Sequence, residues 1–393
     1  MKKYLIIITS LLALLSYSCT EESIEPITKN GSKPMQVTDV SVVNQNGGAI
    51  ISYVIPDDPN LLYVKAVFAS QPGEYRETRA SYYQNSLTLD GFVSTDDCEV
   101  LLYSVSRNEI ESDPIKVTIT PLEAPVTSVL KSIKMEETFG GVRVYFENPT
   151  EASLRLSLLA ENSDGVVSPY DTYYTSRESG FFTSRGMEAA PIKVGVCIRD
   201  RWNNNSDTVY TTVTPKYEKQ LDKTKFKKVE LAGGTYAAHV GSFENLWDNN
   251  TANIFHTKPG SGLPQWFTFD TGVKTQLSRF KLHHRKTGDA TGEYNGGDPK
   301  VYEIWGSNNP DTDGGWENWE LLGSFTSTKP SELPVGTITS EDTQFACIDG
   351  EDFDFPENTP AVRYLRFRII KVWGLLDHMY IAELTFWGGE PQS

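Results

Sequence analysis

Cysteine is scarce in this sequence, and its distribution excludes two kinds of covalent framework. The chain has 393 residues and four cysteines, of which Cys19 lies close to the N-terminus. The other three, Cys98, Cys197 and Cys347, are an odd number of widely separated residues, so they give no disulfide framework and no thiolate metal site. We therefore expect them to be small, buried apolar residues.

Positive charge is also limited. The formal net charge is −16, and no basic stripe runs through the sequence. Such a chain is not expected to bind nucleic acid or an anionic membrane surface, because both attract clusters of lysine and arginine.

The residue patterns of common enzymes are missing. The sequence has no Gly-x-Ser-x-Gly elbow, no His-Glu-x-x-His zinc helix, and no carboxylate pair on recognisable facing strands. Its only adjacent histidines are His283 and His284, which point to opposite faces if they lie on a strand and so would not share a metal. We predict that the protein is not an enzyme.

The N-terminus indicates export and a lipid anchor. Lys2 and Lys3 precede an apolar run over residues 5–15, which is too short to span a bilayer but is typical of a signal peptide. Ser18 directly before Cys19 matches the cleavage pattern of bacterial lipoproteins. We therefore predict a signal peptide over 1–19, lipidation of Cys19 and a flexible tether over 20–34. The alternative is an ordinary signal peptide with a chance cysteine.

An internal repeat covers the first half of the chain. Gly48, Asp113 and Pro121 recur as Gly141, Asp207 and Pro215, at offsets of 93, 94 and 94 residues. A constant offset of this size indicates two copies of one β-sandwich module. Short alternating segments such as 192–198 predict strands, and no long helical period appears.

These patterns predict an all-β protein of three domains. We expect two immunoglobulin- or fibronectin III-like β-sandwiches over 35–121 and 122–215, a linker over 216–234, and a final β domain over 235–393. The second sandwich contains Arg199-Asp200-Arg201-Trp202-Asn203, which we interpret as a structural turn with an arginine–tryptophan stack.

The final domain resembles a known family. Ordered motifs carry the resemblance: Leu246-Trp247-Asp248, Leu263-Pro264-Gln265-Trp266, Val301-Tyr302-Glu303-Ile304-Trp305, Arg363-Tyr364-Leu365-Arg366 and Ile381-Ala382-Glu383-Leu384. They are similar to the strands of discoidin-like domains, the galactose-binding-like jelly roll of coagulation factor 5/8 type C domains. The whole layout, with Thr20-Glu21-Glu22 after the cysteine, resembles surface lipoproteins of Bacteroidota that belong to polysaccharide-utilisation systems.

The resemblance implies a sugar site on loops at one end of this jelly roll. Sugar recognition needs an aromatic face, rigid arginine donors and amide or imidazole groups. The matching positions are His256, Arg285 and Asn295, although the loop before Asn295 is longer than in the family. We expect Trp373 to be the aromatic platform, with His378 and Tyr294 as neighbours. Trp316 and Trp319 flank an acidic turn and could form a second platform, but Trp319 is expected in the core.

The resemblance also implies a structural calcium ion, the one cofactor expected. Asp248, Asn250 and Asn253 stand where related domains place a calcium loop, and Glu383 stands where the closing strand supplies a carboxylate. Asn249 and Asn253 depart from the usual residues. The alternative is an ordinary asparagine-rich turn.

The function that follows is glycan capture at the cell surface. We expect a lipid-anchored outer-membrane protein, facing the exterior, whose last domain binds an oligo- or polysaccharide and which acts with an outer-membrane importer complex. A second hypothesis is an adhesin that binds a protein through the same loops, with Leu375 and Leu376 as an apolar spike. A third, a diverged accessory subunit of a hydrolase, would be indicated by sugar release.

Overall fold

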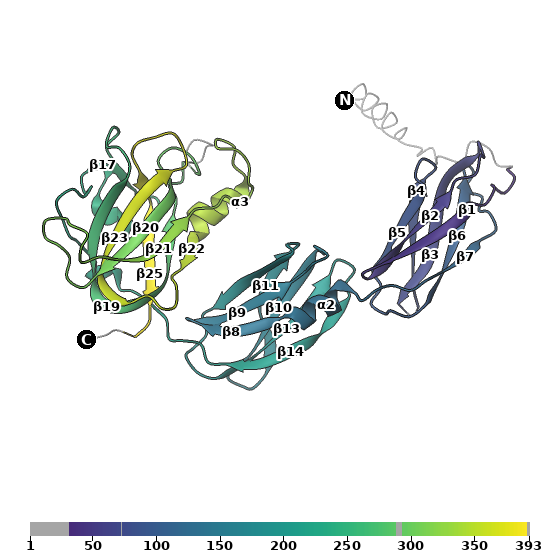
Figure 1. Cartoon of the computed structure of the whole chain (residues 1–393), viewed down its shortest axis with the longest axis horizontal. Helices are drawn as coiled ribbons and strands as arrows, with labels where there is room; N and C mark the ends of the chain where they lie inside the picture. The colour runs from purple at the N-terminus through teal and green to yellow at the C-terminus, as the bar shows by residue number, and fades with distance from the viewer. Residues whose placement is uncertain (1–30, 72, 288–292, 391–393) are drawn as a thin grey trace, which may run out of the picture. The chain divides into compact units, whose positions relative to one another are not determined.

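The computed structural model describes residues 31–71, 73–287 and 293–390. The predicted signal peptide, Cys19 and most of the predicted tether lie outside these residues. Within them the chain is built almost entirely of β-strands, which confirms the all-β prediction (Figure 1). None of the helices in the described part is long and apolar enough to cross a membrane.

The first sandwich has two antiparallel sheets. Alternate residues of each strand are buried and form an aliphatic and aromatic core that includes Ile51, Val64, Phe68, Leu89 and Val100. One sheet has the order β1-β2-β5 and the other β4-β3-β6-β7. The strands are β1 (Thr38–Gln45), β2 (Gly48–Val54), β3 (Leu61–Gln71), β4 (Glu74–Ser81), β5 (Ser86–Asp90), β6 (Cys98–Ser106) and β7 (Ile115–Ile119).

The second sandwich begins with a short helix and has sheets of three and four strands. The orders are β12-β9-β8 and β11-β10-β13-β14. In β13, Val194, Val196 and Ile198 are completely buried, as the alternating pattern predicts. The elements are α2 (Pro125–Ser132), β8 (Lys134–Thr138), β9 (Gly141–Glu147), β10 (Leu154–Glu161), β11 (Val167–Thr175), β12 (Ser179–Arg185), β13 (Ile192–Asp200) and β14 (Asn205–Val213).

The cysteine prediction is only partly right. Cys347 is buried, but Cys98 and Cys197 are only half-buried, and all three are free thiols. Cys98 opens β6, and Cys197 lies on β13 between the fully buried Val196 and Ile198, so the alternation of the strand turns its side chain to the other face.

The chain divides into two compact units, and the boundary runs through the second sandwich. The first unit contains residues up to Lys134 together with 145–181 and 194–210, and the second contains 135–144, 182–193 and everything from 211 onward.

The turn between β13 and β14 connects parts of the first unit. The Asp200 carboxylate accepts hydrogen bonds from the backbone N–H groups of Trp202 and Asn204, at 2.8 and 2.9 Å. The guanidiniums of Arg76 and Arg201 lie over the Trp202 ring, 4.9 and 5.0 Å from its centroid. The predicted structural turn with an arginine–tryptophan stack is confirmed.

The C-terminal domain is organised by one long strand, β19 (Gln265–His283). Its first half pairs with β23 and β16, and its second half pairs with β25 and β22. An aromatic core that includes Phe267, Phe280, Phe367 and Phe386 packs against both halves. The remaining strands are β15 (Lys219–Gln220), β16 (Lys227–Lys228), β17 (Ala238–Gly241), β18 (Phe255–Thr257), β20 (Pro299–Ser307), β21 (Glu320–Thr326), β22 (Glu351–Asp354), β23 (Ala361–Val372), β24 (Tyr380–Ile381) and β25 (Glu383–Gly388).

Short helices complete this domain. They are η2 (Lys223–Lys225), η3 (Phe243–Leu246), α3 (Ser340–Thr343) and the π-helical turn η4 (Gln344–Asp349). The stretch 216–234, which we predicted as a linker, contains β15, η2 and β16, and these pair with or pack beside the strands of the sandwich.

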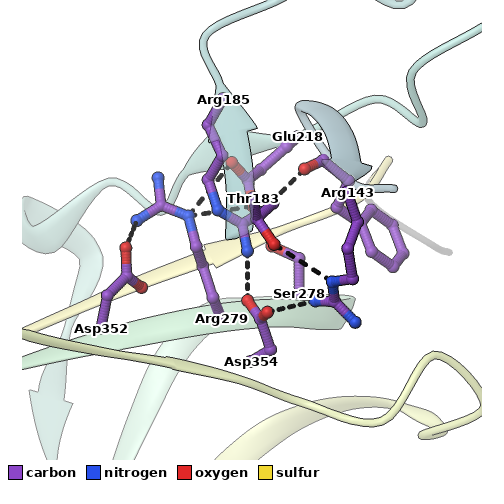
Figure 2. Close-up of polar contacts among 9 residues, drawn as sticks. Arg143, Thr183, Arg185, Glu218, Ser278, Arg279, Asp352 and Asp354 are labelled. Atoms are coloured by element: carbon purple, nitrogen blue, oxygen red, sulfur yellow. Dashed lines mark hydrogen bonds and ion pairs between the residues drawn. The ribbon is translucent and has the colours of Figure 1, made fainter. Parts of the chain in front are cut away.

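A cluster of opposite charges lies inside the second unit (Figure 2). Asp354 accepts hydrogen bonds from Arg143 and Arg185, which extend from β9 and β12. Glu218 contacts Arg185 at 3.5 Å and Arg279 at 3.2 Å, and Arg279 also contacts Asp352 at 3.0 Å. We name these six residues the charged joint, because they tie β9 and β12 of the second sandwich to β19 and β22 of the C-terminal domain.

Candidate functional site

The candidate site is built on a small antiparallel sheet of three strands, in the order β17-β18-β24. In this sheet His256 of β18 lies opposite Val240 on one side and Tyr380 on the other. Alternation within β18 buries Phe255 and Thr257 completely, while His256 between them stays partly accessible. The sheet therefore presents the His256 side of β18 away from the core.

Three predicted sugar-binding side chains meet around Tyr380. The His256 ring lies 4.9 Å from the His378 ring and 5.4 Å from the Tyr380 ring, between centroids. The Arg285 guanidinium lies over the Tyr380 ring at 5.1 Å from its centroid. We name His256, Arg285, His378 and Tyr380 the histidine–arginine site.

Asn295 reaches the site through its backbone. The Tyr380 hydroxyl donates a hydrogen bond of 3.2 Å to the Asn295 carbonyl, and the Asn295 side chain accepts one of 2.8 Å from the Gly296 N–H. Gly296 has a positive φ of 52°, and a Cβ there would lie 2.2 Å from the Tyr380 hydroxyl. The glycine thus allows the loop to approach Tyr380, and Asn295 shapes the site through its turn.

Burial keeps the central imidazole neutral. Burial, together with the nearby His378, Arg285 and His239, lowers the pKa of His256 to about 4. Both of its ring nitrogens are covered and have no hydrogen-bond partner. A neutral imidazole can donate one hydrogen bond and accept another, so His256 can bind a hydroxyl group once the side chains that cover its nitrogens move aside.

Tyr294 and Trp373 do not form the aromatic platform that we predicted. The Tyr294 side chain is completely buried, and its hydroxyl donates to the Thr328 carbonyl at 3.2 Å. The Trp373 ring packs edge-on against Tyr294 at 5.1 Å and donates its indole N–H to the Ser327 hydroxyl at 2.9 Å. Tyr294, predicted as a neighbour of the platform, therefore faces the interior, and the partly buried Trp373 packs over it with the Lys300 ammonium 4.0 Å from its ring centroid.

A buried polar network beneath them has His284 at its centre. The imidazole is completely buried and contacts Asp298 at 3.2 Å and Glu351 at 3.0 Å. Burial alone would lower the pKa of His284, but the two carboxylates raise it to about 10, so the ring is protonated at neutral pH.

This network also positions the loops of the site. Asp298 also accepts hydrogen bonds from the backbone N–H groups of Arg285, at 3.4 Å, and Tyr294, at 3.0 Å. Ser327 donates to Glu351 at 2.6 Å. Sequence reasoning missed both this network and Tyr380, and the only available signal was the polar pair His283-His284 at the end of an apolar strand.

One solved structure decides the family. The SusE-like protein BT2857 is 33% identical to this chain, and the match covers 68% of this chain and 100% of that one, with a TM-score of 0.45. The chain belongs to the SusE-like protein family. Membership of a family of binding proteins agrees with the prediction that the chain is not an enzyme.

Other comparisons match this SusE-like chain in parts. Three family models, each described as a domain of unknown function, match residues 34–121 (DUF4959), 122–224 (DUF5126) and 243–388 (DUF5000). A solved fragment of a Bacteroides thetaiotaomicron protein, described as a putative chitobiase, is 20% identical, covers 44% of this chain and 95% of its own, and has a TM-score of 0.32.

A Clostridium perfringens domain, CBM32-5, was solved in complex with GalNAc-β-1,3-galactose. It is 16% identical, covers 43% of this chain and 99% of its own, and has a TM-score of 0.30. No curated protein sequence matches the chain.

The residues predicted to bind calcium do not fit an ion in this SusE-like chain. Glu383 is buried and accepts a hydrogen bond from the ammonium of Lys223, which is buried as well. Both carboxylate oxygens of Asp248 are used inside the loop, by the Asn250 N–H at 2.8 Å and the Asn253 side chain at 2.6 Å. A lysine ammonium therefore already neutralises Glu383, and the loop has the hydrogen bonds of an asparagine-rich turn.

Proposed function

We propose that this SusE-like chain is a glycan-binding lipoprotein of the cell surface, which captures an oligo- or polysaccharide at the histidine–arginine site. The observation that carries the proposal is that Arg285, His256 and His378 meet around one tyrosine on a single small sheet. Arginine and neutral imidazole are groups that bind vicinal hydroxyls. The Tyr380 ring, which is 4% exposed and lies under Arg285, fixes their positions.

The SusE-like family supports the placement at the surface, because it fits the polysaccharide-utilisation layout that the sequence resembles. We propose that lipidation of Cys19 anchors the chain in the outer membrane, facing the exterior, where it works beside an importer complex. A single site of this kind binds a sugar with a Kd of roughly millimolar to micromolar, about −4 to −8 kcal/mol. Many anchored copies on one polymer raise the apparent affinity through effective concentration.

Calorimetry tests the proposal. Residues 20–393 are titrated with a panel of neutral and acidic polysaccharides, and at least one is expected to bind. Arg285→Ala is expected to weaken that binding at least tenfold, because it removes the only guanidinium that lies over Tyr380 among the described residues. Arg363→Ala is the matched control: Arg363 is also a partly exposed arginine of this domain, but it pairs with Asp270. Equal loss in both variants, or none in Arg285→Ala, would rule out this site.

A second candidate function is adhesion to a protein, favoured by one observation. Leu375 is fully exposed and Leu376 is 41% exposed in the loop that precedes His378. Exposed leucines beside a recognition loop are typical of contacts with proteins. If no polysaccharide of the panel binds, and Leu375→Ser abolishes attachment to one purified protein partner, adhesion replaces glycan capture.

A further inference from the structure

A hollow lined by aromatic residues lies on the same domain, and its lining shares no residue with the histidine–arginine site. Pro264, Trp266, Trp305, Trp316 and Arg368 line it, and its volume is about 390 Å³. We name these five residues the tryptophan hollow. None of them belongs to the small sheet or to the loops around Tyr380.

The sheet register explains why these side chains gather. Trp266 of β19 lies opposite Arg368 of β23, and Arg368 lies opposite Glu303 of β20. Trp305, two residues after Glu303, points to the same face of β20. The next residues along the strands, such as Phe267, Phe367 and Ile304, point to the core and are completely buried. The hollow therefore lies on the outer face of the sheet.

The three indoles are held at fixed angles and are only partly buried. The Trp316 ring meets the Trp266 ring at 5.7 Å and 72°, and the Trp305 ring at 5.1 Å and 74°. The Trp305 indole N–H donates to Glu303 Oε2 at 3.0 Å, and Arg368 donates to the same oxygen at 3.1 Å. Rigid, partly open aromatic faces beside a guanidinium and a carboxylate are features of a binding surface rather than of a core.

A second arginine lies behind the indoles and explains their rigidity. The Arg366 guanidinium is completely buried and stacks on Trp266, Trp316 and Trp319, at 4.0, 4.3 and 4.2 Å from the ring centroids. Trp319 is 7% exposed, as expected of a core residue.

This arginine brings a charge that the domain does not neutralise by hydrogen bonding. Its hydrogen bonds go to uncharged oxygens, of the Thr268 hydroxyl and of the Gly314 and Gly315 carbonyls, and its Nη2 atom has no partner. Burial lowers the pKa of Arg366 to about 10, so it remains a cation at neutral pH. A buried cation of this kind is costly, and the nearby Asp311 carboxylate offsets part of that cost.

The exposed guanidinium at the wall indicates what the hollow takes. Arg368 is 32% exposed, and its hydrogen bond to Glu303 uses one of the five N–H groups of the guanidinium, which leaves the others for a ligand. Indole faces bury the C–H surface of a pyranose ring, and a guanidinium binds a carboxylate.

We propose that the tryptophan hollow is a second glycan-binding surface, which takes a pyranose ring that carries a carboxylate, as in a uronic-acid polysaccharide. The inference rests on the proposed function, because it assigns a second surface to the same glycan-binding domain. Two surfaces on one domain would hold two stretches of one polymer and so increase its retention.

The test uses residues 20–393 and the fluorescence of their tryptophans. The probes are polygalacturonate, alginate and hyaluronan, and fully methyl-esterified pectin serves as the neutral match to polygalacturonate. At least one acidic polymer is expected to bind and change the emission. Trp305→Ala and Trp316→Ala are each expected to weaken that binding at least tenfold. Trp202→Ala is the control, because Trp202 is a partly exposed, arginine-stacked tryptophan of the first unit.

Arg368→Gln keeps the test decisive if a tryptophan variant fails to fold. It removes charge at the wall without removing an indole. The variant is expected to bind acidic polymers several-fold more weakly, while its melting temperature stays within a few degrees of that of the unmodified chain. Equal affinity for esterified pectin and polygalacturonate would overturn the proposed carboxylate. Loss of binding in Arg285→Ala, with none in the hollow variants, would overturn the inference and leave the proposed function standing. Binding of no polysaccharide at all would overturn both.

Discussion

At the scale of single residues, Lys223 changes the interpretation of the closing strand. Its ammonium and the Glu383 carboxylate form an ion pair in which both side chains are over nine-tenths buried. Burial raises the pKa of Glu383, while the contact with Lys223 opposes that shift. The two residues are 160 positions apart in the sequence, and no local pattern connects them. The lysine supplies the positive charge for which the sequence alone suggested calcium.

Replacing Lys223 tests this interpretation. Lys223→Met is expected to destabilise the C-terminal domain by about 3–5 kcal/mol, because it leaves a buried carboxylate without its partner. The double variant Lys223→Met, Glu383→Gln is expected to recover most of the loss, since no unpaired charge remains. Thermal unfolding measures both changes. A chelator is expected to leave the melting temperature of the unmodified chain unchanged, and a large decrease on chelation would show that a metal ion is required after all.

The resemblance to the jelly roll was enough to bring His256, Arg285 and His378 together, because it placed them after the first loop, at the end of a strand and in the last loop of the fold. It was not enough for Tyr294 and Trp373. An aromatic residue in a loop has the same sequence signature whether its ring covers a polar network or faces solvent. Here Ser327 and the His284 network draw both rings inward. Tyr380 was missed for the complementary reason, since a tyrosine on a two-residue strand looks like core.

At the scale of elements, alternation predicted the strands of both sandwiches well but did not predict β15 and β16. These strands are two residues each, too short to show a period, and their charged residues suggested a linker. Pairing with β25 and β19 decides their structure, and that pairing depends on residues more than 40 positions away. The double pairing of β19 was not predicted for a similar reason, because polar residues and Gly272 lie between its apolar halves and nothing in the sequence shows that they form one strand.

The His284 network predicts a stability that depends on pH. The pKa of His284 is raised from 6.5 to about 10 in the folded protein, so the folded state holds the proton more tightly than the unfolded state. The resulting stabilisation is fully present below pH 6.5 and is lost as the pH rises toward 10. We expect the free energy of unfolding to fall by about 2–4 kcal/mol over this range from His284 alone.

Urea unfolding at a series of pH values measures the effect. His284→Gln is expected to be less stable at pH 7 and to lose most of this decline, because glutamine does not titrate. His239→Gln is the matched control, since His239 is exposed and has no carboxylate contact among those described. A decline in His284→Gln as steep as in the unmodified chain would show that other groups cause it.

At the scale of the whole molecule, small networks of ion pairs and stacked arginines lie where modules of the same unit meet. In the first unit the Trp202 turn contacts the first sandwich through Arg76 and through Asp90, which pairs with Arg201 at 3.0 Å. In the second unit the charged joint performs the same task with three arginines and three carboxylates (Figure 2). Within each unit such contacts limit how far neighbouring modules reorient, because linkers alone would leave each module free to do so.

At the charged joint, we predict that the burial of a carboxylate, and not the number of its ion pairs, determines how much it contributes to the free energy of unfolding. Glu218 is 6% exposed and binds Arg279 and the Ser278 hydroxyl, whereas Asp354 is 32% exposed and Glu357, which pairs with Lys216, is 50% exposed. Glu218→Gln is therefore expected to destabilise the second unit by about 2–4 kcal/mol, since it removes the charge of the buried partner of Arg279 and leaves that arginine only Asp352, which is 38% exposed. Asp354→Asn should cost about 1 kcal/mol and Glu357→Gln less, because water screens both.

Calorimetric unfolding ranks the three variants, and limited proteolysis between residues 216 and 226 reports local opening. Glu218→Gln is expected to be cut fastest, because β15 is held on one side by β25 and on the other by the Glu218 contacts. If Glu357→Gln destabilises the chain as much as Glu218→Gln, exposed ion pairs contribute as much stability as buried ones, and the prediction that burial decides is wrong. If only Glu218→Gln opens this segment, the joint depends on its buried carboxylate, and that carboxylate holds the stretch that we predicted as a linker in place.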